Sequence, residues 1–135
     1  MISLIQRVQQ ASVRVNDMTI GEIRQGLLVL VAVEKHDNSA QVDKMAHKLL
    51  NYRVFADADD KMNLSVQDIQ GELLLVSQFT LAANTQKGLR PSFSGSASPE
   101  KGEQMFEQLV EKCRASGLNI ATGQFGASMQ VSLVN

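Results

Sequence analysis

The sequence predicts an α/β fold: one three-layer β/β/α domain with mixed sheets and two main helices, at about 39–51 and 99–116. Segments with the character of strands outnumber the helical ones, and each helical segment lies between strands. A chain patterned in this way builds sheets that are covered by helices. The length of 135 residues fits one domain, so we expect residues 1–135 to fold as a single unit.

Strands dominate the first third of the chain. Residues 3–15 are rich in β-branched side chains and alternate in polarity at 11–15, which is typical of a half-buried strand. Asn16-Asp17 predicts a turn, after which residues 18–23 resume extended structure. The continuous apolar run 27–33 predicts a central strand that is buried on both faces.

The first helix is expected to begin at Asp37-Asn38-Ser39, because residues of these types cap helix N-termini. Apolar residues then recur with the period of a helix packed on a sheet: Val42, Met45, Ala46, Leu49 and Leu50. After this helix we expect a short strand at 52–56, a polar loop at 57–63 and a long strand at 72–81.

The second helix follows a long loop rich in Ser and Gly. Ser98 is expected to cap it, Pro99 suits the first helical position, and Gly117 suits the C-terminal cap. Its buried face is formed by Met105, Phe106, Leu109, Val110 and Cys113. Strands at 118–122 and 128–134 close the chain around a glycine-containing turn.

Composition excludes several classes of protein. Thirteen Lys and Arg balance fourteen Asp and Glu, for a formal charge of −1, whereas proteins that bind nucleic acid mainly through phosphates are usually basic. One Tyr, five Phe and no Trp are too few for an extended platform that stacks single-stranded bases. No apolar run reaches the ~20 residues of a membrane helix, and a single cysteine suits a reducing compartment. We therefore expect a cytoplasmic protein with no membrane partner.

The sequence lacks the motifs of cofactor enzymes. It has neither a Walker-type phosphate loop nor a GxGxxG dinucleotide turn. His36 and His47 do not have metal-ligand spacing, and one cysteine cannot complete an ordinary zinc site. Cys113 lies on the apolar face of the second helix, where we expect packing rather than reactivity. We expect no metal and no cofactor.

Polar residues gather where the strand at 72–81 ends. Ser77, Gln78 and Thr80 follow an apolar run, and crevices in α/β sheets open at strand ends. A strand that simply emerges into solvent shows the same pattern. A Ser or Thr nucleophile needs a base within hydrogen-bond reach, and no His, Asp or Glu lies near this segment in the sequence. Backbone N–H groups here are also candidates for an oxyanion hole.

Two further segments have the composition of ligand-binding loops. Lys87 and Arg90 lie among small residues in a loop that also holds Phe93, a combination suited to phosphate oxygens or a nucleotide. The turn at 123–127 suits a close approach of the backbone. A solvated loop and an ordinary turn around a buried Phe125 explain the same residues.

Several motifs in a fixed order run the length of the chain. They are Arg7-Val8, Ala11-Ser12-Val13, residues 26–31, Lys61-Met62-Asn63, Lys87-Gly88, residues 90–93, Thr122-Gly123 and residues 125–127. Together with Ser77-Gln78-Phe79-Thr80-Leu81, they resemble the bacterial D-aminoacyl-tRNA deacylases, formerly called D-tyrosyl-tRNA deacylases. The family also has a C-terminal motif, which consists of an Asn, a variable residue and then Gly-Pro-Val-Thr. Only the first residue of this motif is present here, as Asn135. We therefore expect a single deacylase domain that lacks its C-terminal tail.

The resemblance implies an editing hydrolase that cleaves the ester between a D-amino acid and the 3′ end of tRNA. It also implies action on glycine mischarged on alanine tRNA. The implied partner is tRNA rather than DNA, and the implied assembly is a homodimer with active sites at the subunit interface. In the family, a cis Gly-Pro peptide from the partner subunit excludes L side chains. Rejection by a rigid backbone is physically sensible, because an L side chain would clash with it.

The resemblance also assigns roles to the candidate residues. The catalytic segment is Ser77, Gln78, Phe79 and Thr80, in which Ser77 and Gln78 orient the substrate amine and the 3′ ribose. The other assignments are Phe125 and Met129 at the adenosine or aminoacyl pocket, Lys87 and Arg90 at phosphates, and Arg7 as a brace for the Gly-Pro loop. Core packing is an equal alternative for Phe125 and Met129.

Two mechanisms are open at this point. In one, Thr80 attacks the ester carbonyl while Gln78 helps to bind the oxyanion. In the other, which the absence of an evident base favours, N–H groups around Phe79 and Thr80 polarise the carbonyl and the tRNA 2′-OH positions a water. The competing functions are a non-catalytic RNA- or nucleotide-binding module and a small-molecule esterase that needs no tRNA.

Overall fold

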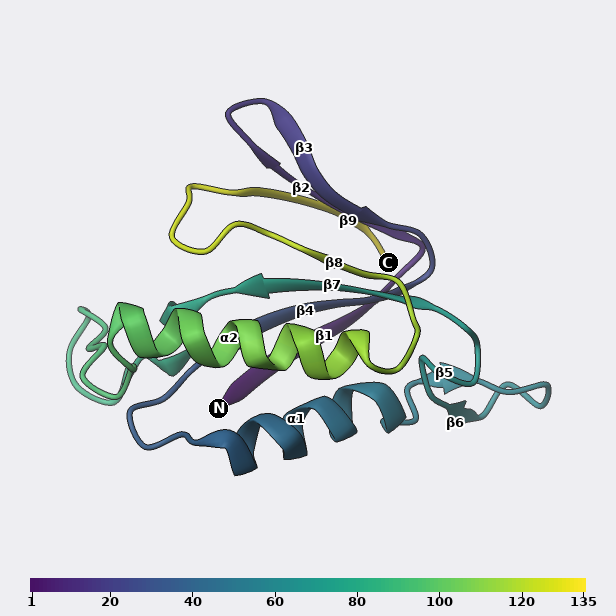
Figure 1. Ribbon diagram of the computed structural model, residues 1–135, viewed down its shortest axis with the longest axis horizontal. Coiled ribbons are helices and arrows are strands. Elements are labelled where there is room, and N and C mark those ends of the chain that lie inside the picture. Colours follow the sequence, from purple (N-terminus) through teal and green to yellow (C-terminus); the bar gives the residue numbers. More distant parts are fainter.

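Two sheets and a pair of helices lie on one another in three layers in the computed structural model of residues 1–135 (Figure 1). The middle layer is a four-stranded sheet, in the order β1 (Ile2–Val8), β4 (Gly26–Ala32), β7 (Glu72–Ser77) and β8 (Ile120–Thr122). A three-stranded sheet covers one face, in the order β3 (Met18–Ile23), β2 (Gln10–Val15) and β9 (Gln130–Val134). Helices α1 (Ser39–Asn51) and α2 (Pro99–Arg114) cover the other face. The predicted β/β/α order of layers is confirmed.

The four-stranded sheet is mixed. Strand β1 runs antiparallel to β4, whereas β4, β7 and β8 are parallel to one another. The three-stranded sheet is antiparallel throughout. Since β4, β7 and β8 share one direction, their carboxyl ends meet at the same edge of the sheet. This edge is where ligand sites form in α/β folds.

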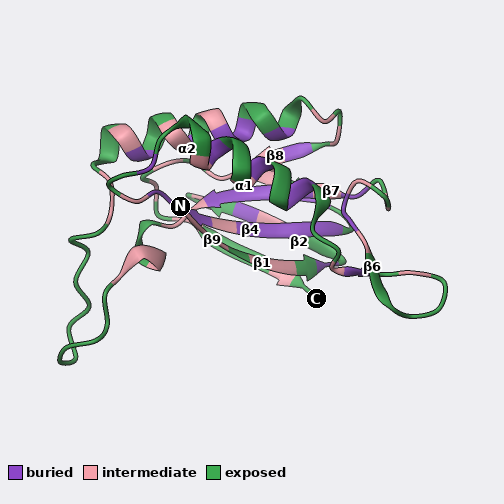
Figure 2. Ribbon diagram, turned by 90° about the horizontal axis from the view of Figure 1, so that it is seen from below, coloured by how far each residue is buried: buried purple, intermediate pink, exposed green.

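The core lies on both sides of the central strands, as the apolar run at 27–33 predicts. Strand residues with odd numbers, such as Leu27, Val29 and Leu73, pack against the helices, and the alternate ones, such as Leu28 and Leu74, pack against the three-stranded sheet. Successive strand side chains point to opposite faces, so one continuous apolar strand serves two cores. Figure 2 shows β4 and β7 as the buried centre of the molecule.

Both helices begin at the predicted caps. The Asn38 side chain accepts a hydrogen bond from the Ala40 amide at 2.9 Å, and Gln41 completes a capping box. Ser98 caps α2, with Pro99 at its first position. Helix α2 ends at Arg114, two residues before the predicted boundary, because residues 115 and 116 form a turn. In that turn the Ser116 hydroxyl donates to the Cys113 carbonyl at 2.6 Å.

The strand predicted at 72–81 is shorter than expected. Strand β7 ends at Ser77, and residues 79–82 form a 3₁₀ turn, η1 (Phe79–Ala82). The Gln78 amide makes the last bond to β4, donating to the Val31 carbonyl at 2.7 Å. The neighbouring strand β8 has already ended, because its last residue pairs with Leu75. With no partner on either side, the chain turns, and the catalytic segment lies mostly on η1.

The region after α1 also differs from the prediction. Only the end of the predicted 52–56 segment is extended, as β5 (Phe55–Ala56). It pairs with β6 (Met62–Leu64), which begins inside the predicted 57–63 loop. The Asp57 carboxylate closes this hairpin by accepting hydrogen bonds from the Asn63 side chain and the Lys61 amide, and these bonds hold the pKa of Asp57 below its usual value.

Neither α1 nor α2 has the length and apolar content that crossing a membrane requires.

Candidate active site

A cavity of about 570 Å³ opens at the carboxyl ends of β4 and β7. Its walls come from the strand ends, from η1, from the first turn of α2 and from the segment that connects β8 to β9. The lining residues are Val33, Val76, Ser77, Gln78, Phe79, Phe93, Ser96, Ala97, Ser98, Pro99, Gly102, Phe125, Gly126, Ala127, Met129 and Val131. The structure therefore brings five predicted site residues together: Ser77, Gln78, Phe79, Phe125 and Met129.

None of the residues that line this cavity has an ionisable side chain. There is no carboxylate, imidazole, thiol or amine in its wall to act as a general base. A hydroxyl nucleophile in this cavity would lack the adjacent base that activates such groups. The arrangement is suited to polarising a bond that is already labile, not to generating a strong nucleophile.

Hydrogen-bond donors are concentrated at the start of η1. The Gln78 side-chain amide donates to the Thr80 hydroxyl, and Thr80 itself does not line the cavity. The backbone N–H groups of Phe79 and Thr80 open the turn, and the first amides of a helical turn have no acceptor within it. Neither amide donates a backbone hydrogen bond outside the regular helices and strands, so both are candidates to bind an oxyanion.

Aromatic and sulfur-containing side chains form the apolar part of the wall. The Phe79 and Phe93 rings meet edge to face, with centroids 5.3 Å apart. Phe125 lies against Gly102 of α2, where an added Cβ would come 3.4 Å from its ring. Met129 lies against Gly123, where an added Cβ would come 2.6 Å from the sulfur. Gly123 thus leaves room for Met129, whereas the contact at Gly102 is ordinary van der Waals packing.

Lys87 and Arg90 do not line the cavity. They lie on the exposed loop between η1 and α2, which projects from the body of the molecule (Figure 2). The base of this loop is closed by a pair of backbone hydrogen bonds between Asn84 and Ser92, of 2.7 and 3.0 Å. Phe93, the next residue, is in the cavity wall, so the cations stand beyond its rim.

Arg7 lies at the other end of the sheet within the same subunit. It pairs with Leu27, four residues along β4 from the partner of Ser77, which is about 13 Å at 3.3 Å per residue. The Arg7 guanidinium donates to the Val54 carbonyl at 2.9 Å. The Asn135 side chain donates to the Arg7 carbonyl at 3.2 Å. The structure therefore places Arg7 beside Asn135 and away from Ser77.

Sequence reasoning missed the wall formed by residues 96–99 and 102. A signal for it was present, because α2 connects two parallel strands, β7 and β8. A crossover helix between parallel strands starts at their carboxyl edge, which is the edge that carries the site. Ser98 and Pro99, which begin α2 as predicted, therefore also form part of the cavity wall.

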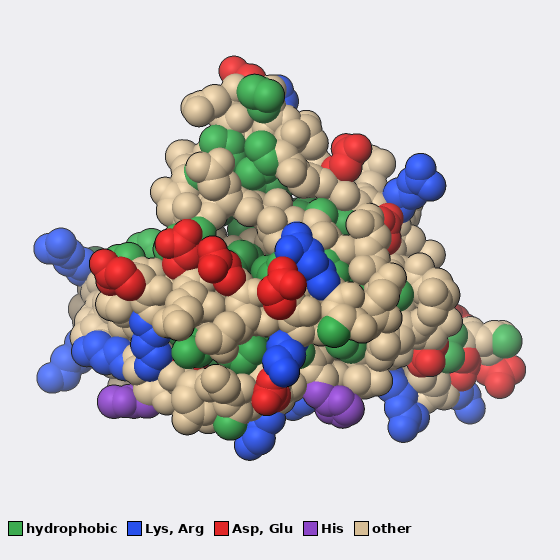
Figure 3. Space-filling view, viewed as in Figure 1, with side chains coloured by type: hydrophobic (Ala, Val, Ile, Leu, Met, Phe, Trp, Pro, Cys, Tyr) green, Lys and Arg blue, Asp and Glu red, His purple; other side chains and the backbone are tan.

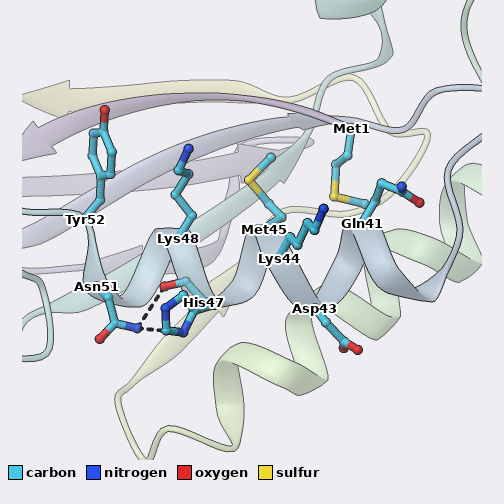
Figure 4. A pocket seen from close by; sticks show the side chains of 9 residues that line it. All are labelled: Met1, Gln41, Asp43, Lys44, Met45, His47, Lys48, Asn51 and Tyr52. Atoms are coloured by element: carbon cyan, nitrogen blue, oxygen red, sulfur yellow. Dashed lines mark hydrogen bonds between the residues drawn. The ribbon is translucent and has the colours of Figure 1, made fainter.

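A second hollow lies along α1, next to the start of β1 (Figure 4). It measures about 790 Å³ and is lined by Met1, Gln41, Asp43, Lys44, Met45, His47, Lys48, Asn51 and Tyr52. None of the predicted site residues is among them. His47 is exposed and its carbonyl accepts a hydrogen bond from Asn51 at 2.8 Å. No three His, Cys, Asp or Glu side chains gather anywhere in the structure as a metal site would require.

Cys113 occupies the core, as expected for a packing residue. It is fully buried, and burial raises the pKa of its thiol to about 11. The thiol is therefore neutral at physiological pH and has little nucleophilic thiolate. Cys113 contributes packing between α2 and the sheet.

Comparison with known proteins matches the whole chain. The family model described as D-Tyr-tRNA(Tyr) deacylase matches residues 4–135. A D-aminoacyl-tRNA deacylase from Haemophilus influenzae is 62% identical over 135 residues, which is 100% of this chain and 93% of that protein. One from Pseudoalteromonas translucida is 56% identical with the same coverage.

Two solved structures share the fold. The first, a c-Myc DNA Unwinding Element Binding Protein, has a TM-score of 0.92 and 38% identity, covering 98% of this chain and 91% of that chain. The second, a probable eukaryotic D-amino acid tRNA deacylase, has a TM-score of 0.84 over 97% of this chain and 91% of its own. At 16% identity, this second likeness concerns the fold alone.

A cavity without a side-chain base is suited to hydrolysing a labile bond. An ester is such a bond, because it is hydrolysed more readily than an amide. Hydrolysis of an aminoacyl-tRNA ester is the chemistry that the names of both bacterial relatives describe, and the chain falls in this class of hydrolases. Within the class it belongs to the D-Tyr-tRNA(Tyr) deacylase family, since the family model matches almost its full length.

Proposed function

We propose that the protein hydrolyses the ester of D-aminoacyl-tRNA, releasing the free D-amino acid and tRNA while rejecting L-aminoacyl-tRNA. The observation that carries the proposal is a cavity without ionisable side chains beside the first backbone amides of η1, in a chain of this family. The substrate is tRNA rather than DNA, although one solved relative is named for DNA binding. Its place of work is the cytoplasm, where charged tRNA is found.

In this mechanism the protein supplies positioning and electrostatics. The N–H groups of Phe79 and Thr80 donate to the carbonyl oxygen as it becomes negatively charged in the tetrahedral intermediate. The terminal 2′-OH of the tRNA positions the attacking water, and the 3′-oxygen leaves with a proton. The absence of any base in the cavity wall supports this route over attack by Thr80, whose hydroxyl accepts a hydrogen bond from Gln78.

The remaining wall binds the end of the substrate. Ser77 and Gln78, where β7 ends, orient the amine and the 3′ ribose. Phe125 and Met129 form an apolar surface on which the terminal adenosine or the aminoacyl side chain rests. Glycine mischarged on alanine tRNA is a second substrate, because it has no side chain to meet the element that rejects L-amino acids.

A homodimer would complete this site. The strands β1 and β9 are edges of the two sheets, and they carry exposed apolar side chains: Leu4, Val131 and Val134. Unpaired edges with apolar side chains favour pairing with another chain. Arg7 and Asn135 lie at the end of the subunit opposite the cavity. In a two-fold dimer that end can approach the partner's cavity, and Arg7 would brace the segment that enters it.

The first test compares D-Tyr-tRNA with L-Tyr-tRNA at equal enzyme, using these 135 residues. Fast loss of the D-ester alone is the expected result. Loss of both esters would support the catalytic cavity but contradict rejection of the L-ester by this chain. A chain that binds charged tRNA without loss of either ester would be a binding module. Equal turnover of free D-tyrosine methyl ester would indicate a small-molecule esterase.

A further inference from the structure

We propose that residues 84–92 form an arm that clamps the unpaired nucleotides preceding the terminal adenosine of the substrate tRNA. Leu89 stacks on a base of this segment, and Lys87 and Arg90 contact phosphates on either side. The inference rests on the proposed function and extends it, since it concerns nucleotides that lie outside the cavity.

The arm is held firmly at its base and is free at its tip. Asn84 and Ser92 exchange two backbone hydrogen bonds, of 2.7 and 3.0 Å. The Asn84 side chain accepts a further bond from the Gln86 amide at 3.0 Å. Beyond this base the chain reverses at Gly88, which has a φ of +65° and no heavy atom near its Cβ position. All residues of the arm are exposed, and Figure 2 shows this loop projecting from the body of the subunit.

The tip exposes an apolar side chain completely. Leu89 has a relative exposure of 104%, the largest among the exposed large hydrophobic residues. A scattered surface Leu is ordinary, but this one stands at the end of a projecting arm with a cation two residues before it and another directly after it. Aliphatic side chains flanked by cations are suited to nucleic acid, where the apolar group meets a base face and the cations meet phosphates.

Charge around the arm favours a polyanion. Residues 73–99 contain no Asp or Glu, and their charged side chains are Lys87 and Arg90, in a chain with a net charge of −1. In Figure 3 this end of the molecule, at the left, carries Lys and Arg side chains, and α2 carries both acidic and basic ones. A strand of RNA that leaves the cavity along this segment would meet the two cations of the arm and no carboxylate from residues 73–99.

The arm also has the right reach. Phe93 lies in the cavity wall, and Leu89 stands four positions before it in the chain, at most about 14 Å away when extended. Stacked nucleotides rise about 3.4 Å each, so the tip lies within a few nucleotides of the adenosine pocket. RNA offers a phosphate at every nucleotide, whereas a second copy of this chain would have to place carboxylates opposite both cations. We therefore assign the tip to RNA.

The experiment compares two esters that differ only beyond the terminal adenosine, D-Tyr-tRNA and 3′-O-D-tyrosyl-adenosine. Leu89→Ala is expected to raise the KM for D-Tyr-tRNA about five- to fiftyfold, because burial of the leucine side chain against a base is lost. It should leave kcat, and the KM for D-tyrosyl-adenosine, within about twofold of the wild type. Leu89→Phe should retain tight binding because a ring also stacks.

The charged pair has its own measurement. Lys87→Ala/Arg90→Ala should flatten the plot of log KM for D-Tyr-tRNA against log salt by about 0.7 for each lost contact to single-stranded RNA. Matched controls outside the cavity and the arm are Met18→Ala, an exposed apolar residue at the start of β3, and Lys44→Ala/Lys48→Ala, an exposed charged pair on α1. Both controls should leave every parameter unchanged.

Three results would overturn the clamp. Leu89→Ala could leave the KM for tRNA unchanged, or it could affect both substrates equally. It could also dissociate a wild-type dimer in sedimentation equilibrium, which would place the tip on a second copy. Failure of the wild type to hydrolyse either substrate would instead overturn the proposed function, and the clamp with it.

Discussion

The Thr80 hydroxyl accepts a hydrogen bond from the Gln78 amide and has no base in the cavity wall beside it. We expect Thr80→Ala to keep kcat for D-Tyr-tRNA within about fivefold of the wild type, because the backbone amide of residue 80 remains. Loss of a true nucleophile costs several orders of magnitude, up to about a millionfold. Single-turnover deacylation measures this, with Thr19→Ala on the exposed strand β3 as control. A loss of a thousandfold would restore the Thr80 nucleophile.

The Met1 α-ammonium group is held by two carboxylates. It donates to Asp37 at 2.7 Å and to Glu34 at 2.8 Å, and Asp37 also accepts from the Glu34 amide at 2.7 Å. Burial alone would lower the pKa of this amine, but the hydrogen bonds and charges of Asp37 and Glu34 outweigh burial and raise the pKa above 8.0. The contacts anchor β1 to the loop before α1.

This anchor makes stability depend on pH in a defined direction. A raised pKa in the folded state contributes stability that is complete below the pKa of the unfolded amine and is lost as pH rises through the folded pKa. The thermal midpoint of the wild type should therefore decrease as the pH rises above about 8. Asp37→Asn should lower the free energy of unfolding at pH 7 by about 1–3 kcal/mol, and with it the thermal midpoint. The midpoint of this variant should also decrease less steeply with rising pH than that of the wild type. Equal slopes of thermal midpoint against pH for the wild type and the variant would contradict a stabilising contact between the Met1 amine and Asp37.

Two glycines show how secondary-structure elements constrain the chain differently. Gly102 lies inside α2, where an added Cβ would meet the Phe125 ring at an ordinary 3.4 Å. Since glycine costs a helix up to about 1 kcal/mol relative to alanine, Gly102→Ala should stabilise the protein by about 0.5 kcal/mol. At Gly26 an added Cβ would overlap the Glu72 carbonyl, where β4 and β7 pair. Gly26→Ala should cost about 3 kcal/mol or more.

Urea unfolding of both glycine variants measures these changes. The sign of the change in the free energy of unfolding is the informative result, because both substitutions add the same methyl group. Destabilisation by Gly102→Ala would mean that Phe125 cannot yield, and that the cavity wall is packed more tightly than its contacts indicate. A neutral Gly26→Ala would contradict the close approach of the two central strands.

The arrangement of the complete subunit leads to a prediction about assembly. The cavity lies at one end of the four-stranded sheet, and the Arg7–Asn135 contact lies at the other. If a partner completes each site, the specific activity on D-Tyr-tRNA should fall on dilution, in step with dissociation of a dimer in sedimentation experiments. Arg7→Ala should lower activity while leaving the fold of the subunit intact. Constant specific activity in a monomeric protein would contradict a shared site.

Much of the fold could be predicted because its signals are local. The apolar period of α1, the cap at Ser98-Pro99 and the double-sided burial of residues 27–33 each follow from neighbours in the chain. The family, too, could be named from short motifs, because they lie in a fixed order along the chain. Position in the sequence was also enough to place Cys113 in the core.

The site itself depends on contacts between distant segments. Residues 77–79, 96–99 and 125–131 form one cavity only because β4, β7 and β8 are parallel and bring their ends to one edge. The change from strand to η1 after Ser77 depends on where β8 ends, and the distance of Arg7 from the cavity depends on the antiparallel pairing of β1. Local propensity governs a helix or a strand, whereas strand pairing and packing, which join residues far apart in the chain, decide which side chains meet.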